Sequence, residues 1–135
     1  MPKNIIADSS ALVAFISRDD QHQRWMAAQA ASLPAPWLTC EAGLTEAFHL
    51  IGDQGGVQLK KLLRRGAVVL SFDLGQELEA VLALMDKYAD VPMSLADACL
   101  VRMTETLPDP VIVTTYTDFK IYRRHSRRVV PCLLP

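Results

Sequence analysis

Two aspartates in this sequence have neighbours that are unusual for surface charges. Asp8 follows the apolar residues 5–7, and Asp97 lies within residues 95–101, which are otherwise wholly apolar. A charge in such a setting is expected to be buried, and a buried charge needs a partner. Carboxylates gathered in one place repel one another and raise one another's pKa unless a cation neutralises them, and oxygen-only ligands suit Mg²⁺ or Mn²⁺. The chemistry expected of such a site is metal-assisted attack of water on phosphorus.

The elements that must position these carboxylates alternate between strands and helices. Strands are predicted at residues 4–7, 37–39, 67–72 and 111–114, with a possible fifth strand at the sheet edge, residues 128–133. Helices are predicted at residues 11–16, 21–32, about 40–51, 57–65, 73–88, 94–107 and 117–125. This alternation favours an α/β fold with one parallel sheet covered by helices on both faces. With 135 residues, of which 50% are apolar, the chain is expected to form a single domain over residues 1–135.

Three carboxylates are expected to meet at one rim of that sheet. Asp8 ends the first strand, and Asp118 opens the helix after the fourth strand. Asp97 lies in the first turn of the helix that Ser94 begins. Ligands of open α/β folds usually bind where the C-terminal ends of the strands meet the following helices. Two of these positions also have a structural alternative, because Asp8 could merely cap the first helix, and Ser94 and Asp97 could form a capping box.

Glu46 is not selected by the spacing of the sequence. It lies on the helix after Thr39 but off the apolar stripe of that helix, so a solvent-exposed glutamate is the default interpretation. Gly43, one turn earlier, would leave space for something to approach. Periodicity alone therefore leaves the role of Glu46 open.

Other polar residues could contact a phosphate. Ser9, Thr114 and Thr115 could orient water or phosphate, although hydroxyls at the ends of elements are mostly ordinary caps. The net charge of -1 conceals two basic stretches, residues 60–65 and 120–128, which hold nine of the fourteen Lys and Arg residues. Arg123 and Arg124 are the candidates for phosphate contacts, and a solvated helix face is the alternative interpretation of these charges.

The composition also bears on the compartment. No apolar run approaches the roughly 18 residues that span a bilayer, and the start of the sequence lacks a signal-peptide core, so we expect no membrane association and a cytoplasmic location. Cys40, Cys99 and Cys132 are odd in number, widely spaced and set among apolar residues. They are predicted to be small buried thiols and not a disulfide framework.

Four stretches of the sequence together resemble the motifs of PIN-domain ribonucleases. They are IADSSAL at residues 6–12, TCEAGLTE at residues 39–46, SLADA at residues 94–98, and VTT with DF within residues 113–119. The resemblance covers nearly the whole chain and includes the VapC-like toxin branch of the family. It implies a three-layer α/β/α sandwich with a sheet of four to five strands and Mg²⁺- or Mn²⁺-dependent endoribonuclease activity on RNA. It also implies a homodimer and a small antitoxin partner that occludes the site.

The resemblance can be carried over residue by residue. The first metal-binding aspartate of the family matches Asp8, the helical glutamate matches Glu46, and the aspartate of the Ser-Leu-x-Asp-Ala stretch matches Asp97. The family commonly has an aspartate directly after the Thr-Thr pair, where this chain has Tyr116, and Asp118 follows two residues later. Either Asp118 supplies the missing carboxylate or the site has three acids. The implied catalytic residues are Asp8, Glu46, Asp97 and Asp118, and the implied metal ligands are Asp8, Asp97 and Asp118.

Other classes fit the sequence less well. Because of Tyr116, the main alternative is a catalytically weakened PIN-like module that binds RNA or regulates. A phosphoacceptor receiver domain would use Asp8 and Asp73, but it would also carry an acidic pair where Asp8 has Ala7 and Ser9 as neighbours. The sequence has no phosphate-binding glycine loop, no Cys or His pair at zinc-ligand spacing and no Gly-x-Ser-x-Gly elbow.

Overall fold

A five-stranded parallel sheet forms the centre of the molecule. The computed structural model describes residues 2–135. The strands lie in the order β3-β2-β1-β4-β7, and every neighbouring pair is parallel. Their bounds are β1 (Asn4–Ala7), β2 (Trp37–Thr39), β3 (Val68–Leu70), β4 (Pro110–Val113) and β7 (Cys132–Leu133). The predicted α/β class, with a parallel sheet of four to five strands, is confirmed.

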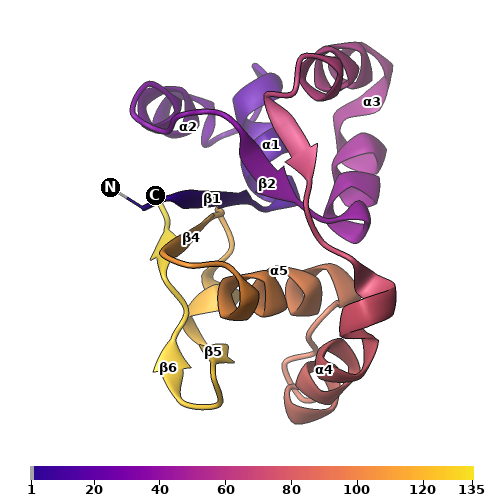
Figure 1. The fold of residues 1–135 in the computed structure, drawn as a ribbon. Coiled ribbons are helices and arrows are strands. Elements are labelled where there is room, and N and C mark those ends of the chain that lie inside the picture. The colour runs from indigo at the N-terminus through magenta and orange to yellow at the C-terminus, as the bar shows by residue number, and fades with distance from the viewer. Residues whose placement is uncertain (1) are drawn as a thin grey trace.

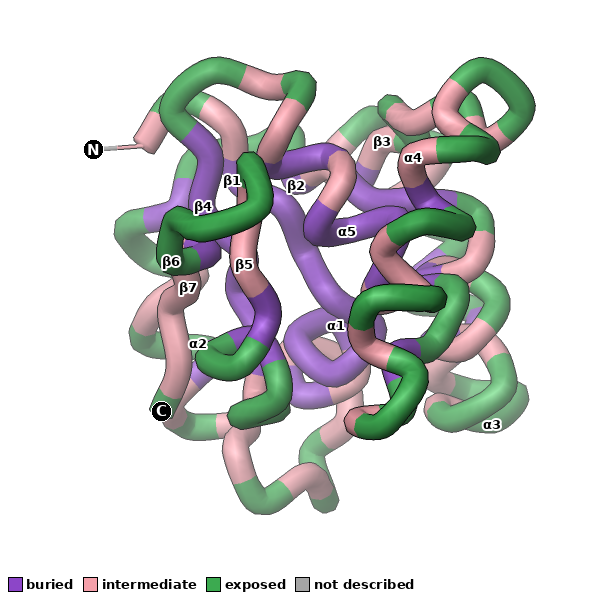
Figure 2. Tube along the Cα trace, turned by 90° about the horizontal axis from the view of Figure 1, so that it is seen from below, coloured by how far each residue is buried: buried purple, intermediate pink, exposed green. Residues whose placement is uncertain are grey.

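Helices cover both faces of this sheet and make three layers (Figure 1). One face carries α1 (Ser9–Ile16), α2 (Gln23–Ala30) and α3 (Glu41–Arg64), and the other carries α4 (Leu74–Lys87) and α5 (Leu95–Thr106). The alternation of β1 explains the two cores, because Ile5 and Ala7 pack on the first face and Ile6 on the second. Figure 2 shows that the inner elements β1, β4, α1 and α5 are the most buried. Within residues 2–135 no helix has both the length and the apolar character needed to cross a bilayer.

Helix α3 consists of two helical segments, so the predicted break at Gly52 is confirmed, but the loop predicted to extend to Gly56 is wrong. The helical backbone is interrupted only at Gly52, which has φ of +71° and ψ of -174°. Gly55 and Gly56 lie inside the second half of α3, and Gly56 is buried. Glycine tolerates this positive φ because it has no Cβ, so the chain bends at one residue and resumes the helix at once.

The C-terminal region differs most from the prediction. The helix expected at residues 117–125 is only a 3₁₀ turn, η1 (Thr117–Lys120), followed by a hairpin of β5 (Arg123–Arg124) and β6 (Arg128–Val129). The helix stops because the Arg123 amide donates to the Tyr88 hydroxyl, at 2.9 Å, instead of continuing the helical pattern. The strand expected over residues 128–133 is divided between β6 and β7, with Pro131 lying between them.

Candidate functional site

Asp8 is a buried carboxylate that three donors hold in place. It directly follows β1 and caps α1, where its Oδ1 accepts from the Ser9 amide at 2.8 Å. Its Oδ2 accepts from the hydroxyls of Ser10, at 2.8 Å, and Thr114, at 2.7 Å. Only 1% of Asp8 is exposed. Burial raises the pKa of Asp8 to about 6, and the negative charge of Asp97 adds to this rise, while the Thr114 and Ser10 hydroxyls oppose it.

Glu46 is connected to Asp8 through one hydroxyl. Ser9 Oγ donates to Glu46 Oε2 at 3.0 Å and lies 3.5 Å from Asp8 Oδ1. Glu46 is half-buried, which differs from the default interpretation of a solvent-exposed glutamate. The expected free space at Gly43 is also absent, because a Cβ there would lie 3.1 Å from Thr39 Oγ1. Gly43 therefore makes room for Thr39, whose hydroxyl donates to the Ala7 carbonyl at 3.0 Å.

Asp97 lies in the first turn of α5 and is fixed by a tyrosine. Its amide donates to Ser94 Oγ at 3.0 Å, which is the capping contact expected as the structural alternative. Its Oδ2 accepts from the Tyr122 hydroxyl at 2.8 Å. Burial raises the pKa of Asp97, and the charges of Glu46 and Asp118 raise it further, against the effect of its hydrogen bonds. Asp97 therefore has two roles, because its amide takes part in the helix cap and its carboxylate faces other acids.

A hollow of about 370 Å³ connects these acids at the surface. Its acidic lining residues are Glu46 from α3, Asp97 from α5 and Asp118 from η1, and the remaining lining residues are His49, Leu50, Ser94 and Tyr116. No Lys or Arg lines it. Asp8 is not part of the lining, but the Ser9 hydroxyl joins it to Glu46 in the wall. The structure therefore brings the four predicted acids to one region at the C-terminal ends of β1 and β4.

The donor set of this region fits Mg²⁺ or Mn²⁺. All four acids offer oxygen, and burial, with a smaller contribution from nearby carboxylates, raises the pKa values of Asp8 and Asp97. Among residues 2–135, the two ion pairs join Arg102 to Glu77 and Glu105, so no lysine or arginine neutralises the four acids. In the same range, no three His, Cys, Asp or Glu side chains already form a group that could hold an ion.

The predicted hydroxyls lie beside the acids. Ser9 and Thr114 are both fully buried, and their hydroxyls bind carboxylates, so they orient Asp8 and Glu46. Thr115 is half-buried, and its amide donates to Ser10 Oγ at 3.0 Å. Contact of Ser9, Thr114 and Thr115 with RNA stays a prediction.

The two predicted arginines contact the protein's own backbone. Arg123 Nη1 donates to the carbonyls of Lys120, Ile121 and Tyr122 at 2.7, 3.2 and 3.0 Å. Arg124 Nη2 donates to the Thr104 carbonyl at the end of α5. These bonds give both guanidinium groups a structural role, and their contact with RNA stays a prediction.

Comparison with known proteins does not assign this chain to a family. No protein-family model matches this chain, and no curated protein matches it. The assignment of function therefore depends on the geometry of the site.

Sequence reasoning missed two residues that shape the site. Ser10 contributes a hydroxyl to Asp8, and its place two residues after the aspartate could have suggested this contact. Tyr122 orients Asp97 from 25 positions away. No local pattern could have indicated Tyr122, because its position depends on the hairpin that the sequence did not predict.

Proposed function

We propose that this chain is a Mg²⁺- or Mn²⁺-dependent endoribonuclease of PIN-like architecture. The observation that supports the proposal most strongly is the linked set of Asp8, Ser9 and Glu46 beside the hollow that Asp97 and Asp118 line. An acidic region without neutralising Lys or Arg favours a divalent cation, and RNA is a substrate that such a cation can help to cleave. The resemblance to PIN-domain motifs agrees with this proposal.

In this mechanism the protein's own residues hold the carboxylates of the site in fixed orientations. Asp8 keeps one orientation because its two oxygens accept from Ser9, Ser10 and Thr114. Asp97 is fixed by the Tyr122 hydroxyl, and Asp118 lies on the exposed side of the hollow. A bound cation would supply charge neutralisation at the phosphate and a more acidic water. Glu46 has one oxygen that Ser9 does not occupy, and this oxygen accepts a hydrogen bond from the attacking water.

The proposal is tested by cleavage of a single-stranded RNA in the presence of Mn²⁺. The wild-type chain should cleave it, and a chelator, Asp8→Asn and Asp97→Asn should each abolish cleavage while the fold is retained. Asp86→Asn is the matched control, because Asp86 is an exposed residue of α4 outside the hollow. Cleavage that survives the chelator and both site variants would contradict the proposal.

Tyr116 favours a second candidate, a PIN-like module that binds RNA without cutting it. It stands where the resembled family commonly has an acid, and it lines the hollow. Binding of the RNA by the wild-type chain without metal-dependent turnover would favour this module over the nuclease.

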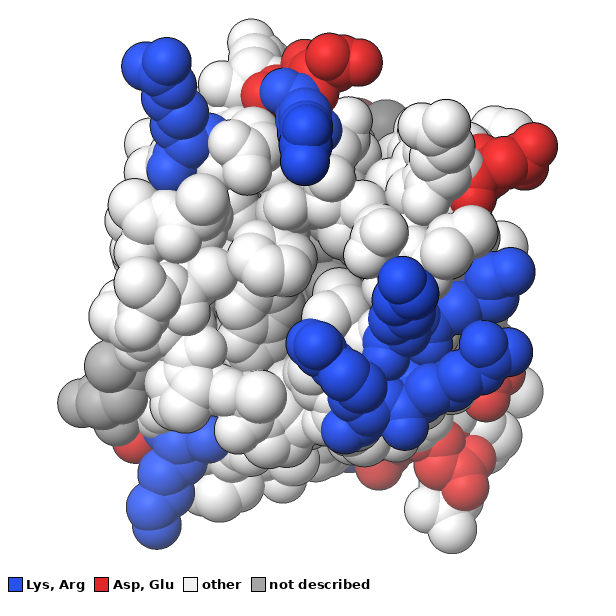
Figure 3. All heavy atoms as spheres, turned by 90° about the horizontal axis from the view of Figure 1, so that it is seen from above, with Lys and Arg blue, Asp and Glu red and all other residues white. Residues whose placement is uncertain are grey.

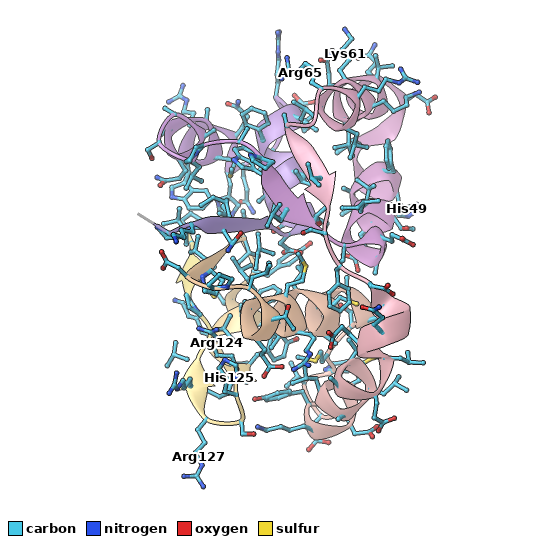
Figure 4. The ribbon with its side chains drawn as sticks, in the orientation of Figure 1. His49, Lys61, Arg65, Arg124, His125 and Arg127 are labelled. Carbon is cyan, nitrogen blue, oxygen red and sulfur yellow. The ribbon has the colours of Figure 1, made fainter. Side chains whose placement is uncertain are left out.

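A partner protein and a homodimer belong to the same proposal. Two adjoining hollows beside α1 and the second half of α3 form one groove. Its lining includes the apolar residues Phe15, Trp37 and Leu62 and the cations Arg18, Lys61 and Arg65. Figure 3 shows basic side chains gathered on this face, and Figure 4 places Lys61 and Arg65 at the far end of α3 from His49. An acidic amphipathic segment, such as that of a small antitoxin, complements such a surface.

The partner is tested by reading the adjacent gene for a small protein and coexpressing that protein with this chain. The two proteins should copurify, and Lys61→Glu with Arg65→Glu should separate them, while retention of the complex would contradict the assignment of this groove. The mass of the purified chain in solution tests the homodimer.

A further inference from the structure

Tyr116 differs from the other aromatic residues of its segment. Phe119 and Tyr122 are fully buried in the core beside α5, whereas 47% of Tyr116 is exposed. Tyr116 lines the acidic hollow together with Glu46, Asp97 and Asp118. Its ring is therefore a large apolar surface that the protein leaves open at the mouth of the proposed site.

The backbone holds Tyr116 at this place. Its amide donates to Thr114 Oγ1 at 3.0 Å, and the same oxygen donates to Asp8 Oδ2. The amide of the intervening Thr115 donates to Ser10 Oγ. One hydrogen-bonded network thus fixes both the buried carboxylate and the residue that carries the exposed ring.

A nucleotide beside these acids needs an attraction that does not depend on charge. The hollow has no Lys or Arg in its lining, so its side chains repel a phosphate unless a cation lies between them. Stacking on an aromatic ring tolerates any base, since every base has a π-face. Tyr116 and the exposed Leu50 are the lining residues that offer apolar surface for such a contact.

We propose that the Tyr116 ring stacks on an unpaired base next to the phosphodiester that is cut, so that Tyr116 is a residue that binds the substrate. This inference rests on the proposed nuclease function and deepens it by naming this binding residue. A base inside a duplex is covered by its neighbours and cannot stack on a side chain without being displaced from the helix.

Binding of a short oligouridylate that carries 2-aminopurine tests the inference in the presence of Ca²⁺ in place of Mn²⁺. Stacking should quench the 2-aminopurine fluorescence on the wild-type chain. Tyr116→Ala should abolish the quenching and weaken affinity about 5- to 100-fold. Tyr116→Phe and Tyr116→Trp should retain both, which separates stacking from hydrogen bonding by the phenol. Ile121→Ala is the control, because Ile121 is exposed but lies outside the hollow.

Steady-state cleavage with Mn²⁺ provides the second readout. Tyr116→Ala should raise KM while kcat stays close to the wild-type value, because the ring binds the substrate without contacting the scissile bond. Equal affinity and equal quenching for Tyr116→Ala and the wild-type chain would overturn the stacking inference. Absence of cleavage by the wild-type chain would instead contradict the nuclease function, and the binding experiment would still decide the role of Tyr116.

Discussion

At the scale of single residues, the site keeps a carboxylate in an unfavourable environment. Asp8 is nearly inaccessible, yet only neutral hydroxyls and one amide offset its burial. Such a group is stabilised by protonation or by a cation. The free energy of unfolding should therefore depend on the charge state of Asp8.

The pH dependence of stability follows from the pKa of Asp8. In the fold this pKa is about 6, above the usual 3.8, so the neutral form stabilises the fold below pH 3.8 and this stabilisation is lost as the pH rises through about 6. Asp8→Asn keeps a neutral group at all pH values. Without metal, it should raise the free energy of unfolding at neutral pH by about 1–3 kcal/mol, measured by urea denaturation.

Two further measurements complete this test. The gain from Asp8→Asn should vanish when unfolding is repeated below pH 4, because the wild-type carboxyl is then neutral as well. A loss of stability at neutral pH in the metal-free Asp8→Asn protein would show that Asp8 is a structural cap alone.

The sequence indicated Asp8 and Asp97 as site residues more clearly than Glu46, because their neighbours in the sequence differ. Asp8 and Asp97 stood out because apolar neighbours predicted their burial. Glu46 was suggested only by the family resemblance, since helical periodicity placed it in solvent. Its half-burial depends on Ser9, a contact across 37 positions that no local pattern encodes.

At the scale of elements, the strands and most helices followed from apolar periodicity, and the hairpin of β5 and β6 did not. The basic composition of residues 120–128 predicted a solvated helix, but tertiary contacts decided the structure. The buried Tyr122 ring packs against Tyr88 and Phe119, and Lys87 Nζ donates to the Ser126 carbonyl at 2.9 Å. These contacts hold the turn of the hairpin against α4.

The hairpin gives the basic residues distinct roles. Arg127 and Arg128 are exposed, whereas Arg123 and Arg124 are half-buried and bound to carbonyls. If the hairpin follows the RNA backbone, Arg127→Ala with Arg128→Ala should reduce the slope of log RNA affinity against log salt concentration. The reduction should correspond to about one to two phosphate contacts, and the melting temperature should stay unchanged. Arg123→Ala with Arg124→Ala should lower the melting temperature. An unchanged slope for the Arg127 and Arg128 pair would mean that these side chains are only solvated.

The bend in α3 can be tested with matched glycine substitutions. Gly52→Ala places a Cβ on a residue with φ of +71° and should cost about 1 kcal/mol of unfolding free energy. Gly75→Ala, in the first turn of α4, should instead stabilise by about 0.5–1 kcal/mol, because a Cβ there meets only Asp73 Oδ1 at 3.4 Å. Thermal denaturation of both variants measures the difference. Equal effects would contradict a strained backbone at Gly52.

At the scale of the whole molecule, the parallel sheet separates two surfaces. The acids gather where β1 and β4 end, whereas the groove includes Trp37 and Val68, the first residues of β2 and β3. A partner segment in the groove therefore needs additional length along α1 and α3 to cover the acidic hollow. Alternating strands and helices predicted this architecture. In a parallel sheet the C-terminal ends of the strands lie at one edge and their N-terminal ends lie at the opposite edge.

Titration with Mn²⁺, followed by the loss of the free-ion electron paramagnetic resonance signal, tests the central claim most directly. The wild-type chain should bind Mn²⁺ at neutral pH, and Asp97→Asn should weaken that binding at least about tenfold, while Asp86→Asn leaves it unchanged. Equal Mn²⁺ affinity for the wild-type chain and Asp97→Asn, or no binding by the wild-type chain, would contradict a cation site among these carboxylates.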